Sequence, residues 1–249
     1  MKLLSPRLAA TRLYCDLPLS PGAEIVLPDA AARHAVSVLR LQVGDALNLF
    51  NGTGGEYRAS LVAVNKRETR VRLIEFDATE RESPVDITLA LGISAGERMD
   101  YSLQKATELG VTAIQPLATE RSVVKLAGER ADKRLQHWQH VVIAACEQCG
   151  RNRVPAVAPV QKIYAYLAAV DRNKRLLMLS PDAGTPLKRV ASAAAAVLLI
   201  GAEGGLAPSE YQAAQACGFE PVNLGPRILR TETAPVAALA LLQALWGDL

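Results

Sequence analysis

Hydrophobic and polar positions follow two different patterns along this chain, and the change comes near residue 77. In the first part, short runs of alternating or β-branched apolar residues predict strands at 46–50, 56–64 and 69–76. The spacing of apolar residues predicts one helix, over residues 30–41. A turn signal, Asn51-Gly-Thr-Gly-Gly55, separates two of the strands, because glycine tolerates positive φ. Short strands this close together, with one helix, predict a small barrel.

The second part alternates strands with helices. It follows a charged, non-periodic stretch that ends at Pro84, which we interpret as a linker with a domain boundary between residues 76 and 77. Strands are expected at 85–93, 111–117, 175–179, 195–200 and 219–224. Helices are expected at 98–109, 129–149, 162–170, 209–216 and 231–246. This alternation predicts an α/β domain over residues 77–249, with a parallel sheet covered on both faces.

The composition is that of an ordinary globular protein. Of the 249 residues, 50% are apolar and 21% are charged. No window holds the roughly 18 consecutive apolar residues that a membrane span needs. The first twelve residues lack the apolar run and small-residue cleavage site of a signal peptide. We therefore expect a cytoplasmic protein with no membrane partner.

The four cysteines do not predict a metal site. Cys146 and Cys149 form a C-x-x-C pair, but no second pair follows. The three histidines do not complete a zinc-finger spacing. Positions three apart in a helix share a face, so we interpret these cysteines as reduced cytosolic thiols and expect no metal.

The net charge of +3 is unevenly distributed. Residues 1–76 carry ten Lys and Arg against seven Asp and Glu, whereas residues 77–249 carry eighteen of each. The whole excess therefore lies in the first domain. A small positive bias is compatible with contacts to an RNA backbone, but many basic surfaces bind nothing.

The first candidate site is the loop Ile200-Gly-Ala-Glu-Gly-Gly-Leu206. It directly follows an apolar strand, and ligands of parallel α/β sheets collect at that end of the strands. Its three glycines let the backbone approach a ligand closely. A plain strand-to-helix turn is the alternative interpretation. The spacing is not G-x-G-x-x-G, which disfavours a nicotinamide site.

The second candidate site is Leu224-Gly-Pro-Arg-Ile-Leu-Arg-Thr-Glu-Thr-Ala-Pro235. It also follows a strand and leads into a helix, and the helix N-terminus together with Arg227 and Arg230 would attract an anion. The alternative is a capped helix with solvated charges. Two glycine-containing loops at neighbouring strand ends are expected to form one cleft.

Five motifs make the chain resemble the RsmE family, which methylates N3 of a uridine in bacterial 16S ribosomal RNA and belongs to the SPOUT superfamily. They are His34-Ala-Val-Ser-Val-Leu-Arg40 with Gly44-Asp45, Gln104–Gly110, Glu147–Arg151 with Pro155, Gly201-x-Glu-Gly-Gly205 and Leu224–Ala234. The resemblance covers nearly the whole chain. Two positions depart from the family pattern: Ala202 replaces a usual proline, and Leu179-Ser-Pro181 lacks a histidine that often precedes the proline.

The resemblance implies a two-domain fold and a cofactor. Residues 1–76 would be a PUA-like barrel that helps to hold RNA, and residues 77–249 a SPOUT domain whose C-terminal segment forms a trefoil knot, a rare feature of folds. The cofactor would be S-adenosyl-L-methionine. The partners would be 16S ribosomal RNA in the assembled small subunit and a second copy of the chain in a homodimer.

The motif match also assigns residues to roles. Cofactor contacts would come from Leu179, Ser180, Pro181, Gly201, Glu203, Gly204, Gly205, Leu224, Gly225, Ile228, Leu229, Arg230, Thr231 and Ala234. Ile228 and Leu229 would pack on the adenine. Arg230 would stabilise the negative charge on the deprotonated uracil. Glu203 or Glu232 would accept the N3 proton, although Glu203 could instead bind the cofactor and Glu232 could cap the helix. RNA contacts would come from Arg7, Arg12, Arg33, His34, Arg40, Arg151 and Arg153.

Two other functions stay open at this point. A SPOUT methyltransferase acting on transfer RNA or on a ribose 2′-hydroxyl would keep both loops but need no proton acceptor for N3. A ribosome-assembly factor that binds RNA without catalysis would keep the basic surface. Intact Gly204, Gly205, Arg230 and Glu232 argue against loss of catalysis.

Overall fold

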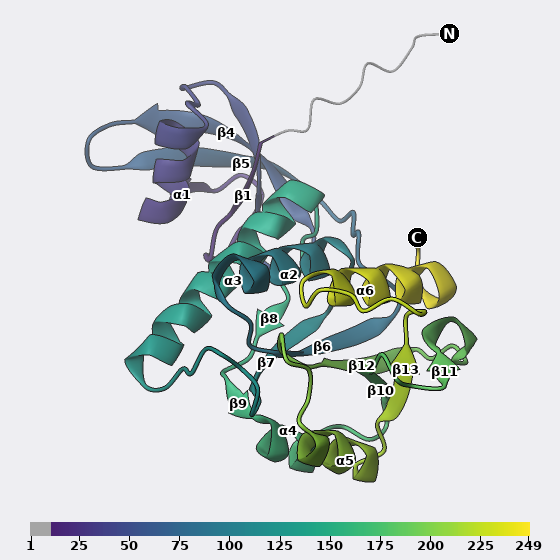
Figure 1. Ribbon diagram of the computed structural model, residues 1–249. Helices are drawn as coiled ribbons and strands as arrows, with labels where there is room; N and C mark the ends of the chain where they lie inside the picture. Colours follow the sequence, from purple (N-terminus) through teal and green to yellow (C-terminus); the bar gives the residue numbers. More distant parts are fainter. Residues whose placement is uncertain (1–10) are drawn as a thin grey trace, which may run out of the picture. The chain divides into compact units, whose positions relative to one another are not determined.

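The computed structural model describes residues 11–249 (Figure 1). The chain forms two compact units. One contains the residues up to Glu82 together with Cys146–Val154, and the other contains Ser83–Ala145 and Pro155–Leu249. We call the first the N-terminal unit and the second, after the methyltransferase domain that the resemblance implies, the catalytic-domain unit. Each is described by itself.

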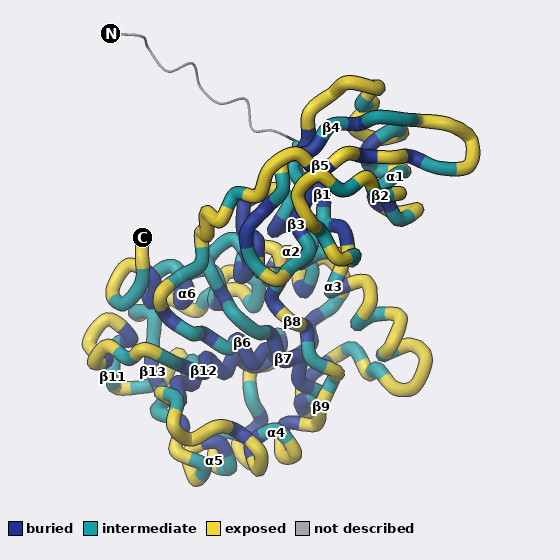
Figure 2. The backbone as a smooth tube through the Cα atoms, turned by 180° about the vertical axis from the view of Figure 1, so that it is seen from behind, coloured by how far each residue is buried: buried dark blue, intermediate teal, exposed yellow. Residues whose placement is uncertain are grey.

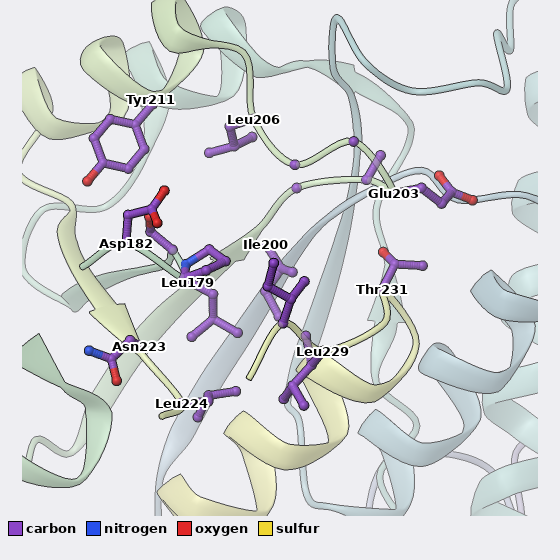
Figure 3. A pocket seen from close by; sticks show the side chains of 18 of the residues that line it. Leu179, Asp182, Ile200, Glu203, Leu206, Tyr211, Asn223, Leu224, Leu229 and Thr231 are labelled. Atoms are coloured by element: carbon purple, nitrogen blue, oxygen red, sulfur yellow. The ribbon is translucent and has the colours of Figure 1, made fainter. Parts of the chain in front are cut away.

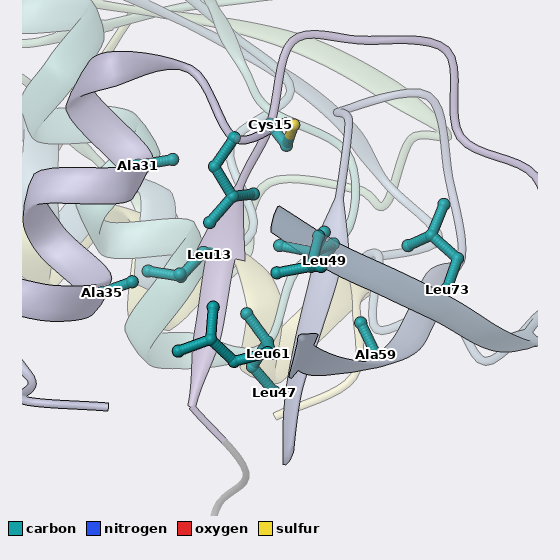
Figure 4. Packing of buried hydrophobic residues seen from close by; sticks show 11 residues of the cluster. Leu13, Cys15, Ala31, Ala35, Leu47, Leu49, Ala59, Leu61 and Leu73 are labelled. Atoms are coloured by element: carbon teal, nitrogen blue, oxygen red, sulfur yellow. The ribbon is translucent and has the colours of Figure 1, made fainter. Parts of the chain in front are cut away.

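The N-terminal unit is built on a five-stranded sheet. The strands are β1 (Arg12–Tyr14), β2 (Glu24–Val26), β3 (Ala46–Phe50), β4 (Glu56–Val64) and β5 (Thr69–Asp77), in the order β1-β3-β4-β5-β2. β1 pairs with β3 in parallel and the other pairs are antiparallel. Alternate positions of β4 and β5 point inward, as their period-two pattern predicts. The core is aliphatic, with Leu13, Leu49 and Leu61 among its buried side chains (Figure 4).

The helix of the N-terminal unit is shorter than predicted. α1 (Asp29–Arg33) continues as a single widened π-helical segment, η1 (His34–Val38), and ends there rather than at Leu41. Arg40 has φ of +58°, a left-handed conformation that stops a helix. The alanine-rich pattern of residues 30–41 carried no signal for this stop.

The N-terminal unit also extends past the predicted boundary at residue 77. Glu80 accepts a hydrogen bond from the Gly55 amide, and the Thr79 carbonyl accepts one from the Asn152 side chain. Glu82 pairs with Arg151. These contacts place the former linker, residues 78–82, and the segment Cys146–Val154 with the N-terminal sheet.

The catalytic-domain unit contains an eight-stranded parallel sheet. Its strands are β6 (Asp86–Gly92), β7 (Ala113–Ala118), β8 (Ala156–Val157), β9 (Gln161–Lys162), β10 (Arg175–Leu179), β11 (Thr185–Pro186), β12 (Ala195–Ile200) and β13 (Glu220–Asn223). The order is β11-β13-β10-β12-β6-β7-β8, with β9 also paired to β7. Every pair is parallel. The central strands are buried along their length, as their continuous apolar sequences predict (Figure 2).

Helices cover both faces of this sheet, which confirms the predicted α/β fold. α2 (Gly96–Glu108) and α6 (Thr233–Trp246) pack together on one face, and α4 (Ile163–Ala169) and α5 (Pro208–Ala216) on the other (Figure 1). The long helix α3 (Glu129–Cys149) has the predicted bounds, and a short 3-10 turn, η2 (Leu187–Arg189), follows β11. Within residues 11–249, no helix combines the length and apolar character needed to cross a bilayer. The trefoil knot stays a prediction.

Candidate functional site

A cavity of about 640 Å³ opens at the carboxyl ends of β10, β12 and β13 (Figure 3). Its walls come from three segments: the turn after β10, the glycine loop Gly201–Leu206 after β12, and the segment Leu224–Thr231 that leads into α6. Parallel strands end at one edge of the sheet, so the loops that follow them lie together. The cavity is within the size range of small-ligand and cofactor sites.

The two loops chosen from the sequence lie side by side in this cavity. Thirteen of the fourteen predicted cofactor residues line it: Leu179, Ser180, Pro181, Gly201, Glu203, Gly204, Gly205, Leu224, Gly225, Ile228, Leu229, Thr231 and Ala234. Arg230 does not line it, and neither does Glu232. Their contact with a cofactor stays a prediction, but the predicted cleft is present.

Backbone packing leaves no room for a side chain at two positions, one in the glycine loop and one beside it. A Cβ on Gly201 would lie 2.5 Å from the Gly205 carbonyl carbon, because the loop folds back on itself. A Cβ on Gly92, at the end of β6, would overlap the Ala202 backbone nitrogen. Glycine is therefore required at both positions by backbone packing.

Glu203 lies at the edge of the cavity with its carboxylate directed away from Ile200 and Leu229 (Figure 3). Its Oε1 accepts a hydrogen bond of 2.9 Å from the Ala95 amide, at the N-terminus of α2. The Arg98 guanidinium lies 3.5 Å from the same oxygen. A helix N-terminus stabilises a carboxylate. Glu203 thus joins the glycine loop to α2 through one oxygen, whereas its Oε2 is buried without a hydrogen-bond partner among the described residues. Its role as proton acceptor stays a prediction.

Arg121, from the loop after β7, forms another part of the cavity wall. Its Nη1 donates a hydrogen bond of 2.9 Å to the Gly204 carbonyl oxygen. The loop that carries Arg121 is held in turn by Glu210, a buried residue of α5. The two oxygens of Glu210 accept hydrogen bonds from the amides of Glu120 and Ala207.

The second segment is less tightly held. The Gly225 amide donates to the Asn223 side chain, and the Arg230 carbonyl accepts from the first amides of α6. Ile228 lines the cavity and is 85% exposed, and its packing on adenine stays a prediction. The Arg230 side chain is exposed. Glu232 is the N-cap residue of α6, but its side chain makes no capping hydrogen bond. Its carboxylate lies 4.0 Å from Arg98 Nε.

The chemical character of the cavity suits an adenosyl compound. Its middle is aliphatic, with Leu179, Ile200, Leu224 and Leu229, and backbone groups of the loops surround it. The Thr231 hydroxyl is buried without a hydrogen-bond partner among the described residues. An orphaned buried polar atom beside an apolar cavity is satisfied when a polar ligand binds.

Several lining residues were not chosen from the sequence: Arg121, Asp182, Tyr211 and Asn223. Three of these residues lie in elements that adjoin the two chosen loops, at β13 (Asn223), after β10 (Asp182) and in α5 (Tyr211). Arg121 follows β7, another strand of the same sheet. Because parallel strands end at one edge of a sheet, the loop after β7 could have been predicted to adjoin the cavity. Residues 119–127 of that loop contain no glycine, which was the signal used for the other two loops.

Two predicted RNA contacts in the N-terminal unit are corrected by the structure. The Arg12 guanidinium pairs with buried Glu56, donates to the Asn152 side chain and stacks on the Phe50 ring. Burial lowers the pKa of Arg12. Arg151 is 4% exposed and pairs with Glu82 at 2.5 Å. Both guanidiniums serve the interior of the unit and are not presented to RNA.

The other predicted RNA contacts differ in exposure. Arg33, Arg40 and Arg153 are exposed, and Arg153 lies 3.7 Å from Glu80. His34 is half-buried, 3.7 Å from the Glu147 carboxylate. Burial raises the pKa of Glu147. Arg7 lies outside the described residues. Within residues 11–249, no three His, Cys, Asp or Glu side chains are grouped to hold a metal ion.

Comparison with known proteins identifies both units. Residues 81–243 match an RNA methyltransferase domain and residues 27–74 match an RNA methyltransferase PUA domain. A ribosomal RNA small subunit methyltransferase E from Buchnera aphidicola is 34% identical over 96% of this chain and 97% of its own length. One from Synechocystis is 37% identical over 90% of this chain and 74% of its own length.

Solved structures agree. A ribosomal RNA small subunit methyltransferase E from Neisseria gonorrhoeae, bound to S-adenosyl methionine, is 43% identical, with a TM-score of 0.90 over 96% of this chain and 99% of that one. A methyltransferase from Legionella pneumophila with bound cofactor is 39% identical, with a TM-score of 0.92 over the same shares. Fold, cavity and family models together define an RNA methyltransferase with a PUA domain. Within that class, the chain belongs to the ribosomal RNA small subunit methyltransferase E family.

Proposed function

We propose that this protein transfers a methyl group from S-adenosyl-L-methionine to N3 of a specific uridine in 16S ribosomal RNA. The observation that carries the proposal is the cavity between Gly201–Leu206 and Leu224–Thr231, which brings together the two loops that the sequence singled out. Membership of the family supports the RNA substrate, and the cofactor-bound relatives support the donor.

The cofactor would occupy the cavity, with its adenosyl group against Leu179, Leu224 and Leu229 and with the glycine loop along it. When bound, it supplies an electrophilic methyl group on a sulfonium. The protein's contribution is mainly to hold donor and acceptor in line, which lowers the entropic cost of reaction. The Thr231 hydroxyl, which has no hydrogen-bond partner among the described residues, would be available to the cofactor.

The acceptor requires an unpaired or flipped-out uridine, because N3 lies in the pairing edge of the base. The N3–H bond must break, the new N–C bond forms, and the methyl–sulfur bond breaks. Arg230, exposed beside the cavity, would stabilise the negative charge on the uracil carbonyl oxygens. Glu203 or Glu232 would accept the N3 proton, although one oxygen of Glu203 is already engaged at the N-terminus of α2.

RNA would be held in part by the N-terminal unit. Arg33, Arg40 and Arg153 are the exposed cations among the predicted contacts within residues 11–249. His34, next to Arg33, and Arg7 also belong to the prediction. Each phosphate contact contributes to affinity in a salt-dependent way. Loss of one such contact should reduce the salt slope of binding by about one unit.

Two further parts of the proposal concern context. The protein would act as a homodimer, and its substrate would be the assembled small subunit in the cytoplasm, as the family resemblance implies. Light scattering on the purified chain would test the dimer: a monomer at micromolar concentration would contradict it. Methylation of free 16S RNA as fast as that of the subunit would contradict the assembled substrate.

The decisive experiment maps the methylated nucleotide. Small subunits from cells lacking this activity are incubated with the protein and S-adenosyl-L-methionine, and the RNA is read by reverse transcription. N3-methyluridine blocks pairing, so one strong stop should appear at one uridine, only when both protein and cofactor are present. Methylation of a ribose hydroxyl or of transfer RNA would favour another target. No methylation and no cofactor binding by folded protein would favour a non-catalytic RNA-binding factor.

A further inference from the structure

Arg121 is a cation fixed in the wall of the cavity by its surroundings. Its loop is closed by a 2.9 Å hydrogen bond between the Thr119 and Ser122 hydroxyls. The amide of Glu120, the residue before Arg121, donates a hydrogen bond of 2.7 Å to the carboxylate of buried Glu210. These bonds set where the Arg121 backbone lies before any ligand arrives.

The Arg121 side chain is also fixed. It lies along Gly204, where an added Cβ would come within 3.0 Å of the Arg121 Cβ. One N–H of the guanidinium is used, by the 2.9 Å bond from Nη1 to the Gly204 carbonyl. A guanidinium has five donors. Arg121 lines the cavity, and among residues 11–249 no carboxylate forms an ion pair with its guanidinium.

None of the other charged side chains that line the cavity is a cation held in position by a hydrogen bond or an ion pair among the described residues. Glu203 is directed toward α2. Asp182 lies with Tyr211 at the opposite end of the cavity from Glu203 and Thr231 (Figure 3). Arg227 is an exposed cation in the loosely held segment, and no hydrogen bond or ion pair fixes it among the described residues. Arg121 is therefore the cation of the cavity that is already positioned.

We propose that the Arg121 guanidinium is the subsite for the α-carboxylate of the cofactor's methionine moiety. The proposal rests on the proposed use of S-adenosyl-L-methionine. A guanidinium presents paired donors that match a carboxylate. Because one N–H of Arg121 is held by the Gly204 carbonyl, part of the side-chain freedom is already lost before a ligand binds. Arg121 thus links the geometry of the glycine loop to the charge of the ligand.

The test uses two ligands that differ at the methionine end. S-adenosylhomocysteine carries the carboxylate and amino groups, whereas 5′-methylthioadenosine lacks both. Arg121→Gln keeps an N–H donor for the Gly204 carbonyl but removes the charge. By calorimetry, this variant should bind S-adenosylhomocysteine at least about tenfold more weakly and methylthioadenosine within about threefold of the wild type. Arg121→Lys should lie between the wild type and Arg121→Gln.

Arg189→Gln is the matched control, since it removes the same charge from an exposed arginine of the same unit that does not line the cavity; both affinities should stay within about threefold of the wild type. Equal weakening of both ligands by Arg121→Gln would show that Arg121 only holds the loop, and would overturn the carboxylate subsite alone. Unchanged affinity for both ligands would also overturn it. Failure of S-adenosylhomocysteine to bind the wild type would overturn the proposed function and this subsite with it.

Discussion

The arginines of the two units cannot be told apart in the sequence, but they differ in exposure and in ion pairing in the structure. In the N-terminal unit, the Arg12 and Arg151 side chains are 10% and 4% exposed and are paired with Glu56 and Glu82. In the catalytic-domain unit, Arg121 and Arg230 are exposed at or beside the cavity, and no carboxylate pairs with either among the described residues. A buried pair specifies the interior, whereas an unpaired exposed cation is available to an anion. Whether the fold places a carboxylate beside an arginine therefore determines whether that arginine stabilises the interior or can bind an anion.

The largest expected effect is on stability, at Arg151. Arg151→Ala leaves Glu82 without its partner and should lower the free energy of unfolding by about 3 kcal/mol, as measured by urea denaturation. Arg58→Ala is the control in the same unit, because its pair with Glu75 is exposed and should contribute less than about 1 kcal/mol. Equal effects of the two substitutions would contradict the distinction between buried and exposed arginines.

The next effect is on cofactor affinity, at the glycine loop. Gly201→Ala places a Cβ against the Gly205 carbonyl carbon, so the loop must open. Calorimetry should show at least about a hundredfold loss of affinity for S-adenosylhomocysteine, about 2.7 kcal/mol. Gly225→Ala is the matched change in the second segment. It meets open space but has φ of +100°, so it should cost less than Gly201→Ala. The reverse order would show that the glycine loop is not the rigid wall.

Arg230 tests the exposed side of the comparison. Arg230→Ala should reduce methyl transfer at saturating cofactor by at least about tenfold, about 1.4 kcal/mol in the barrier, because charge on the uracil oxygens loses its partner. Cofactor affinity and unfolding free energy should change little, since the side chain neither lines the cavity nor packs inside. Arg189→Ala, another exposed arginine of the same unit, is the control. Transfer at the wild-type rate would remove Arg230 from the mechanism.

The smallest effect is a pH dependence in the N-terminal unit. Burial raises the pKa of Glu147 above its ordinary value of 4.5, so the folded state holds this proton more tightly than the unfolded chain. The contribution of this group to the free energy of unfolding is therefore lost as pH rises from 4.5 through the higher pKa that Glu147 has in the folded state. Glu147→Gln still accepts from the Tyr14 amide and should raise the unfolding free energy near pH 7 by less than about 1 kcal/mol. The gain should vanish below about pH 4; a gain independent of pH would exclude this cause.

The sequence predicted most of the catalytic-domain sheet because its strands are continuous apolar runs. β10 and β12 have the predicted bounds, and so has helix α3. The two-residue strands β8, β9 and β11 were missed, since a pair of residues carries no period. Both loops of the cavity were predicted from glycine and from their places after strands.

The roles of charged side chains were harder to predict. The sequence offers Glu203 as a candidate proton acceptor but does not predict the hydrogen bond that its carboxylate accepts from the Ala95 amide, 108 positions away. Arg12 bonds with Asn152 over a similar separation, of 140 positions. Such pairs form only once the chain has folded, and a single sequence holds no record of them. The hydrogen bond between Arg121 and Gly204 joins residues that are likewise far apart, by 83 positions.

The central claim is that one cavity in the catalytic-domain unit binds the cofactor between the glycine loop and the segment before α6. Amide hydrogen exchange with and without S-adenosylhomocysteine tests it directly. Protection should rise in residues 201–206 and 224–231 and stay unchanged in the N-terminal sheet, residues 46–77. Protection confined to other segments, or none at saturating ligand, would contradict the claim.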